Sequence, residues 1–336
     1  MYVRRNIRLN LIAKFAWKNI LLFILWSAAV TWLYHVADHN GYDLGIPFLP
    51  LSTIGIAVAF YIGFKNNASY DRFWEGRKIW GGIVNYSRSW AMNVLTLVKD
   101  GEEVKRALIY RHIAWINALR VQLRQPNSFS LKESRSVEAL FEKHGERNPV
   151  CAGLDKFISS EEVNDLNDRK NVATHLIKNQ AIQINKLLSE EKLTEFDKTI
   201  FHSNLEEFYN LQGKCERIKN TPFPRQYAYF SQVFTWIFIF LLPFGLLDVF
   251  EGQMIEGRNL DIYEWLLFLM IPFSVLISWI FATMEAVGNS SEDPFEGRVN
   301  DVPMTALCRT IEIDLRDMLD EKELPEKVQP KDNILY

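Results

Sequence analysis

Few residues in this sequence have both the types and the spacing that chemistry requires. His35 and His39 lie four residues apart, a spacing that places two imidazoles on one face of a helix, and Asp38 or Asp43 would add a carboxylate. Such a ligand set suits zinc or a related metal. Two histidines at the end of an apolar segment are explained more simply as interfacial or loop residues, so we expect no metal site.

Motifs of the common enzyme classes are also missing. The sequence contains no G-x-G-x-x-G, no Walker loop, no H-E-x-x-H and no G-x-S-x-G. No nucleophile stands beside a base, and the three cysteines, Cys151, Cys215 and Cys308, lack the C-x-x-C spacing of redox or metal sites. We expect reduced thiols, no cofactor and no enzymatic activity.

Two rows of residues with a period of four run side by side through residues 50–81. The rows consist of Gly55, Ala59 and Gly63, and of Ile56, Phe60 and Phe64. A row of small residues lets a neighbouring helix approach closely. A row of large apolar residues suits ordinary helix packing or, in a ring of helices, a narrow throat that gates by dewetting.

Polar residues follow the large row directly. Asn66, Asn67 and Asp71 come within two turns of Phe64. They predict either a solvated helix face just inside a membrane or a polar vestibule beneath a throat.

Four stretches without Asp, Glu, Lys or Arg position these rows in a membrane. They are 19, 21, 22 and 20 residues long and cover residues 19–37, 44–64, 226–247 and 265–284. About 20 helical residues cross a hydrocarbon core of roughly 30 Å. Four such stretches exclude an ordinary soluble enzyme, and the net charge of −3 offers no basic excess for nucleic acid. We expect an all-α fold with four transmembrane helices per subunit.

The distribution of Lys and Arg predicts the orientation. Basic residues precede the first stretch, follow the second and precede the third, whereas the loop 38–43 has none and the loop 248–264 is acidic. Cytoplasmic loops carry the basic excess, so we expect both termini of a multi-pass inner-membrane protein in the cytoplasm. The expected division begins with an N-terminal segment (1–18) and a hairpin with a pore-lining second helix (19–64). A cytoplasmic helical region (65–225), a second hairpin (226–284) and a C-terminal segment (285–336) follow.

Periodicity within the cytoplasmic region predicts helices at 103–124 and 172–190, and a capping box at Thr194 and Asp197 begins another that runs to about Ile218. The stretch 74–98 either continues the second membrane helix or forms a helix closely following it.

Three blocks of the sequence resemble the bacterial bestrophin family. The longest runs from Gly63 to Gly81, the second from Cys215 to Pro224, and the third joins Asp293–Glu296 to Asn300–Pro303. The resemblance implies a homopentameric ion channel, assembled as a ring around a central pore. In that family the second membrane helix lines a neck with three apolar side chains.

Aligned on the first block, the neck residues become Ile56, Phe60 and Phe64, so the resemblance favours the pore-lining interpretation of the large row. The family also has a cytoplasmic aperture below the neck. Counting back from the second block suggests Phe196 as its residue.

The resemblance does not extend to calcium activation, which belongs to eukaryotic members of the family. There the calcium site uses an acidic run after the fourth membrane helix. In this sequence Asp293 and Glu296 replace the Asn and Gly that flank Pro-Phe, and Arg298 interrupts the run. We therefore expect no calcium dependence, and we interpret the segment as a subunit contact.

The sign of the permeating ion is left open by the residues. Phe ring edges carry partial positive charge that favours anions, whereas acidic outer loops attract cations. We predict a channel for chloride or other small anions; the alternatives are a monovalent-cation channel of the same fold and a non-conducting membrane scaffold. A transporter is disfavoured because the four stretches contain no Asp, Glu, Lys or Arg and show no repeat. The expected partners are inorganic ions, the lipid bilayer and further copies of the chain, with no nucleic acid.

Overall fold

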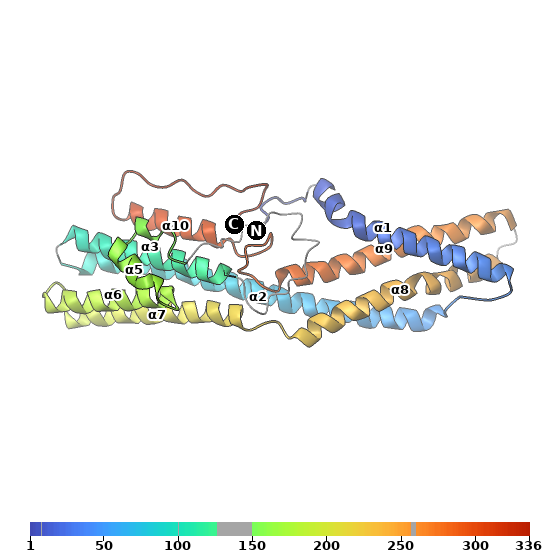
Figure 1. The fold of residues 1–336 in the computed structure, drawn as a ribbon, viewed down its shortest axis with the longest axis horizontal. Coiled ribbons are helices and arrows are strands. Elements are labelled where there is room, and N and C mark those ends of the chain that lie inside the picture. The colour runs from blue at the N-terminus through green and yellow to red at the C-terminus, as the bar shows by residue number, and fades with distance from the viewer. Residues whose placement is uncertain (8, 100, 126–149, 257–259) are drawn as a thin grey trace.

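The computed structural model of the chain describes residues 1–7, 9–99, 101–125, 150–256 and 260–336. Within these ranges the structure is a long bundle of helices with two halves, joined by one helix that runs through both (Figure 1). This agrees with the predicted all-α fold. The elements are α1 (Leu9–His39), α2 (Phe48–Leu97), α3 (Glu102–Arg124), the short 3₁₀ turn η1 (Leu154–Lys156), α5 (Ser160–Asn167), α6 (Val172–Ser189), α7 (Glu195–Asn220), α8 (Arg225–Glu256), α9 (Leu260–Ser291) and α10 (Met304–Asp317).

One half of the bundle contains every helix that is long and apolar enough to cross a membrane. The candidate spans in the described chain are Ile12–His39, Phe48–Leu97, Arg225–Phe250 and Phe268–Ser291. Each contains most or all of one of the four charge-free stretches. The four predicted membrane helices are therefore confirmed.

The 50-residue helix α2 joins the two halves. At 1.5 Å per residue it is about 75 Å long, more than twice the thickness of a hydrocarbon core. Its N-terminal half packs against α8 and α9, and its C-terminal half packs against α3, α7 and α10 (Figure 1). The stretch 74–98 is thus a continuation of the second membrane helix and not a separate element.

The other half is built around buried aromatic side chains. Trp80 and Trp90 of α2 and Trp115 of α3 are fully buried, and the ring of Trp90 lies edge-on to Phe201 and Phe208 of α7. The helices predicted at 103–124 and 172–190 are present as α3 and α6.

Helix α7 begins where the sequence predicts. Thr194 Oγ1 accepts a hydrogen bond from the Asp197 backbone N–H at 3.2 Å, and the Asp197 carboxylate accepts one from the Thr194 N–H at 2.9 Å. This capping box satisfies two backbone donors that a helix start would otherwise leave unpaired.

The membrane half packs closely where glycines meet large side chains. A Cβ on Gly55 would lie 2.7 Å from the Phe238 ring of α8, so only a glycine fits there. Ala59 is exposed and Gly63 has no atom within 4 Å of such a Cβ. The row of small residues therefore packs against another helix of the chain at Gly55 only.

The two ends of the chain lie side by side (Figure 1). The Val3 N–H donates to the Asn333 carbonyl at 2.9 Å, and the Leu335 N–H donates to the Met1 carbonyl at 2.8 Å. The charged segment after α10 therefore lies along the surface of the half with the aromatic core, which is the half built around Trp80, Trp90 and Trp115.

Candidate functional site

The large apolar row on α2 faces away from the rest of the chain. Ile56, Phe60 and Phe64 are 70 %, 68 % and 63 % exposed, whereas Val58 and Ile62 on the opposite face are buried against the neighbouring helices. The rings of Phe60 and Phe64 meet edge to face, with centroids 5.0 Å apart. The three side chains thus form a continuous apolar surface that no other part of the described chain covers.

Polar residues extend the same face of α2 toward the half with the aromatic core. Asn67 and Asp71 are exposed and follow Phe64 at intervals of three and four residues, which keeps them on its side of the helix. Lys78 is exposed one heptad beyond Asp71. Asn66 points elsewhere, because its Nδ2 donates to the Met284 carbonyl of α9 at 3.1 Å. Of the three predicted vestibule residues, Asn67 and Asp71 share the face of the apolar row.

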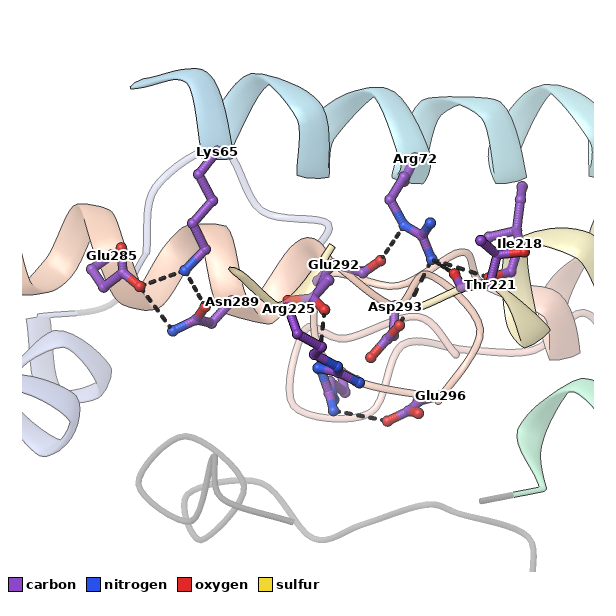
Figure 2. Close-up of polar contacts among 11 residues, drawn as sticks. Lys65, Arg72, Ile218, Thr221, Arg225, Glu285, Asn289, Glu292, Asp293 and Glu296 are labelled. Atoms are coloured by element: carbon purple, nitrogen blue, oxygen red, sulfur yellow. Dashed lines mark hydrogen bonds and ion pairs between the residues drawn. The ribbon is translucent and has the colours of Figure 1, made fainter. Parts of the chain in front are cut away.

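A buried charged pair lies on the opposite side of α2 at the level of Phe64. The Lys65 ammonium, 2 % exposed, donates to the Glu285 carboxylate and to the Asn289 side-chain oxygen, both on α9 (Figure 2). The second carboxylate oxygen of Glu285 accepts a hydrogen bond from Ser231 Oγ of α8 at 2.6 Å. The pair therefore ties together three of the four membrane helices.

Farther along α2, Arg72 reaches across to two segments, the end of α7 and the end of α9 (Figure 2). Its Nε donates to the Glu292 carbonyl at 2.9 Å, and its Nη2 donates to the Ile218 and Thr221 carbonyls at 3.0 Å each. These carbonyls belong to the residues where α7 and α9 end. Arg72, which lies in the long sequence block, thus fixes the junction between the two halves.

The acidic residues after α9 are engaged in ion pairs. Glu292 lies 3.5 Å from Arg225 (Figure 2). Glu296 lies 3.5 Å from Lys219 and 2.8 Å from Arg298. Burial raises the pKa of Glu292, and Asp293 beside it raises it further. A hard cation would have to compete with these arginine and lysine side chains for the carboxylates of Glu292 and Glu296.

Asp301 completes this segment. Its side chain is 2 % exposed and accepts a hydrogen bond from the Arg298 backbone N–H at 2.9 Å. Burial raises the pKa of Asp301 to about 6, against the opposing effect of that hydrogen bond. Across the part of the chain that the structure describes, no three His, Cys, Asp or Glu side chains gather as a metal site would require.

Phe196 lies at the other end of the molecule, in the first turn of α7. It is 86 % exposed, the largest exposed fraction among the large apolar side chains of the described residues. Ile182 of α6 is a second exposed apolar residue in this half, at 57 %. Both are available to face a pathway or another chain.

The histidine pair at the C-terminal end of α1 forms no cluster. His35 and His39 are exposed, and the carboxylate of Asp43 accepts a hydrogen bond from the Gly45 N–H at 2.6 Å. Asp43 is therefore occupied in shaping the turn between α1 and α2.

Sequence reasoning missed Lys65, Glu285 and Lys78. A usable signal existed for the first two, because each is the first charged residue after a charge-free stretch. For Lys78 the signal was its spacing of seven residues from Asp71.

Four spanning helices, with an exposed apolar row on the longest, define a polytopic α-helical membrane protein. The sequence matches the family described as Bacterial/Fungal Bestrophin protein over residues 7–317, and the chain belongs to the bestrophin family. This confirms the resemblance carried by the three sequence blocks. The assignment also places the chain among membrane proteins of channel type and not among enzymes.

Relatives and solved structures agree with this assignment. The voltage-dependent anion channel-forming protein YneE of Escherichia coli K12 is 31 % identical over 316 residues, which cover 93 % of this chain and 89 % of YneE. A protein of the same description from Mesorhizobium japonicum, mll4386, is 28 % identical over 88 % of this chain and 82 % of its own. The crystal structure of a bacterial bestrophin homologue from Klebsiella pneumoniae superposes with a TM-score of 0.74 and 25 % identity, covering 90 % of this chain and 98 % of that one.

Proposed function

We propose that this protein is an anion channel of the inner membrane, in which five copies of the chain surround a central pathway lined by α2. The observation that carries the proposal is the exposed row Ile56, Phe60 and Phe64 on a membrane helix whose other face is buried. Five such rows around an axis would form a hydrophobic neck. The names of the relatives, which are described as anion channel-forming, support the choice of anions.

The neck would act by controlling hydration. A constriction lined by Ile and Phe offers water and ions no hydrogen-bond partner, so a small change in its width switches it between dry and wet states. Phe edges directed at the axis would favour a passing anion over a cation. Asn67 and Asp71 would lie in a wider vestibule on the cytoplasmic side, and Phe196 is the candidate for a second constriction at its far end.

Asp71 supports a second candidate, a channel selective for monovalent cations. Its carboxylate is exposed on the face of the apolar row, and among the described residues it forms no ion pair within the chain. Five such carboxylates just below the neck would concentrate cations. Lys78, about 10 Å deeper at 1.5 Å per residue, would oppose them.

The reversal potential of the purified protein in a planar bilayer under a KCl gradient separates these candidates. A reversal near the chloride potential supports the anion channel, and a reversal near the potassium potential supports the cation channel. Oligomeric mass in detergent tests the ring independently, since a monomer or dimer would leave α2 without an axis to line. Pentamers that pass no current would favour a non-conducting scaffold. For the channel and the scaffold alike, we propose that both termini lie in the cytoplasm.

A further inference from the structure

The buried pair lies directly behind the neck. Lys65 follows Phe64 in sequence, yet Lys65 is 2 % exposed and Phe64 is 63 % exposed. Nine residues separate Lys65 from Ile56, which at 3.6 residues per turn places the ammonium about half a turn away from the start of the row. The rotation of α2 about its own axis therefore sets both directions at once: where the Lys65 side chain points and where the apolar row points.

The partners of Lys65 allow only one such setting. Its ammonium reaches Glu285 and Asn289 on α9 (Figure 2). Glu285 is itself held by the Ser231 hydroxyl of α8. A buried charge that loses its partner is strongly unfavourable in a membrane protein as in a soluble one. A turn of α2 about its axis would separate the ammonium from the carboxylate, so the pair opposes that turn.

The same turn of α9 also packs closely against α2 at Gly288. A Cβ on Gly288 would lie 2.1 Å from Asn66 Oδ1 and 3.8 Å from Lys65 Cε, so α2 and α9 approach here as only a glycine permits. Asn66 adds its own bond to the Met284 carbonyl at 3.1 Å. Lys65 and Asn66, which directly follow Phe64 in α2, thus both form hydrogen bonds to α9.

We propose that Lys65 and Glu285 are positioning residues, which fix the rotation of α2 and thereby direct Phe60 and Phe64 toward the axis of the pathway. The inference rests on the proposed function, because it assigns a support to the neck proposed there. Neither side chain touches the permeating ion. Ser231 and Asn289 hold the carboxylate and the ammonium in place.

The test is a double-mutant comparison of single-channel conductance in planar bilayers. The variant Lys65→Met/Glu285→Gln removes both charges while preserving the length of each side chain, so neither partner is left as a buried unpaired charge. The second variant, Phe60→Ala/Phe64→Ala, removes the neck, and the third combines all four changes. Each is first shown by its mass in detergent to assemble as the unmodified protein does.

We expect the charge-free variant to conduct several-fold more than the unmodified protein, because α2 turns and the rings leave the axis. In the alanine-neck background the same charge removal is expected to change nothing, since no rings remain to be misdirected. Such non-additivity is the signature of two sites acting through one element. A residue with a merely structural role would alter both backgrounds by the same factor.

Three results would overturn the inference. Unchanged conductance in an assembled Lys65→Met/Glu285→Gln protein means that the pair does not position the row. An equal change in both backgrounds means that it acts elsewhere. If Phe60→Ala/Phe64→Ala itself conducts like the unmodified protein, the neck assignment fails and the positioning role fails with it, which separates this outcome from the first two.

Two further variants guard the comparison. Arg88→Gln/Asp314→Asn removes a partly exposed ion pair between α2 and α10, on a different face of α2 from the apolar row, and is expected to leave conductance unchanged. Should the charge-free variant fail to assemble, Ser231→Ala removes only the α8 hydroxyl from Glu285. It is expected to raise conductance by a smaller factor, again only with the neck intact, and no change would contradict the proposal.

Discussion

The two halves of the molecule use the same helix in opposite ways. In the half with the aromatic core, α2 turns Trp80 and Trp90 inward, and both are completely buried among α3, α7 and their neighbours. In the membrane half it turns Phe60 and Phe64 outward, and both are more than half exposed. One half completes an aromatic core within a single chain, whereas the other leaves Phe60 and Phe64 in contact with each other but largely uncovered by the described part of the chain.

The difference indicates which half depends on assembly. A core closed within one chain is stabilised by that chain alone, so changes to it are expected to alter folding. A row that the chain leaves bare contributes little to the folding of one subunit, so changes to it are expected to alter what the assembled protein does. Substitutions of similar size should therefore lower stability when they fall in the aromatic core and change conductance when they fall in the exposed row of α2.

The largest loss of stability is expected for Trp90→Ala. Removing a fully buried aromatic ring costs about 3–5 kcal/mol, because the transfer free energy is lost and a cavity remains between the rings of Phe201 and Phe208. Thermal unfolding in detergent and the yield of assembled protein would measure it. The control is Met92→Ala, an exposed position on the same part of α2. A Trp90→Ala protein as stable as the control would contradict a self-contained core.

Next is Phe60→Ala/Phe64→Ala, where the expected change is in conductance and not in stability. The two rings are exposed and in contact with each other, so the subunit loses little buried area when they are removed. Without them the neck is wider and easier to wet, and conductance rises. Phe268→Ala on α9 is a matched control, because it removes an exposed ring from another membrane helix. Unchanged currents in an assembled protein would assign the row to packing between subunits.

A third effect is expected from acid in the half with the aromatic core. Burial lowers the pKa of His112 to about 3, and its Nε2 lies 2.8 Å from Ser87 Oγ. In the unfolded chain His112 is protonated as the pH falls below about 6.5. In the folded chain it stays neutral until about pH 3. This contribution to stability is therefore complete above pH 6.5 and is lost as the pH falls, by about 1.4 kcal/mol per pH unit.

This dependence of stability on pH is tested by measuring the thermal midpoint of unfolding between pH 7.5 and pH 4.5. His112→Gln should show a flatter decline than the unmodified protein, and His35→Gln, exposed at the end of α1, should decline as the unmodified protein does. Parallel curves for all three proteins would mean that His112 is not held neutral by its surroundings.

Much of this architecture is visible in the sequence because its causes are local. Charge-free stretches predict the four spans, and the Thr194 and Asp197 side chains predict the start of α7 from their own backbone geometry. The row Ile56, Phe60 and Phe64 follows from helical periodicity. Periodicity alone could not tell that the row is exposed, since packing in a bundle and lining a pathway produce the same spacing.

What escaped prediction depends on contacts between distant segments. Lys65 meets Glu285 across 220 residues of sequence, and Arg72 meets the Thr221 carbonyl across 149. No local pattern specifies such partners. The same limit explains Asn66, whose place beside Asn67 suggests a shared vestibule, although its amide instead binds the Met284 carbonyl of α9.

The smallest effect, and the one that probes the comparison most finely, is expected for single methyl groups in the row of small residues. Gly55→Ala drives a Cβ into the Phe238 ring at 2.7 Å, and such overpacking costs about 1–3 kcal/mol. Gly63→Ala meets nothing within 4 Å in the chain and should stabilise an isolated subunit slightly, since alanine is favoured over glycine in a helix by roughly 0.5–1 kcal/mol.

The two glycines therefore separate contacts within a chain from contacts between chains. Gly55→Ala should lower the thermal midpoint of both monomeric and assembled protein. Gly63→Ala should be silent in the monomer, so a loss of assembled mass would place a neighbouring subunit against Gly63 and extend the bare surface of α2 into a subunit contact. If Gly63→Ala leaves assembly intact and Gly55→Ala disrupts it, the small row serves the interior of each subunit, and only the large row serves the ring.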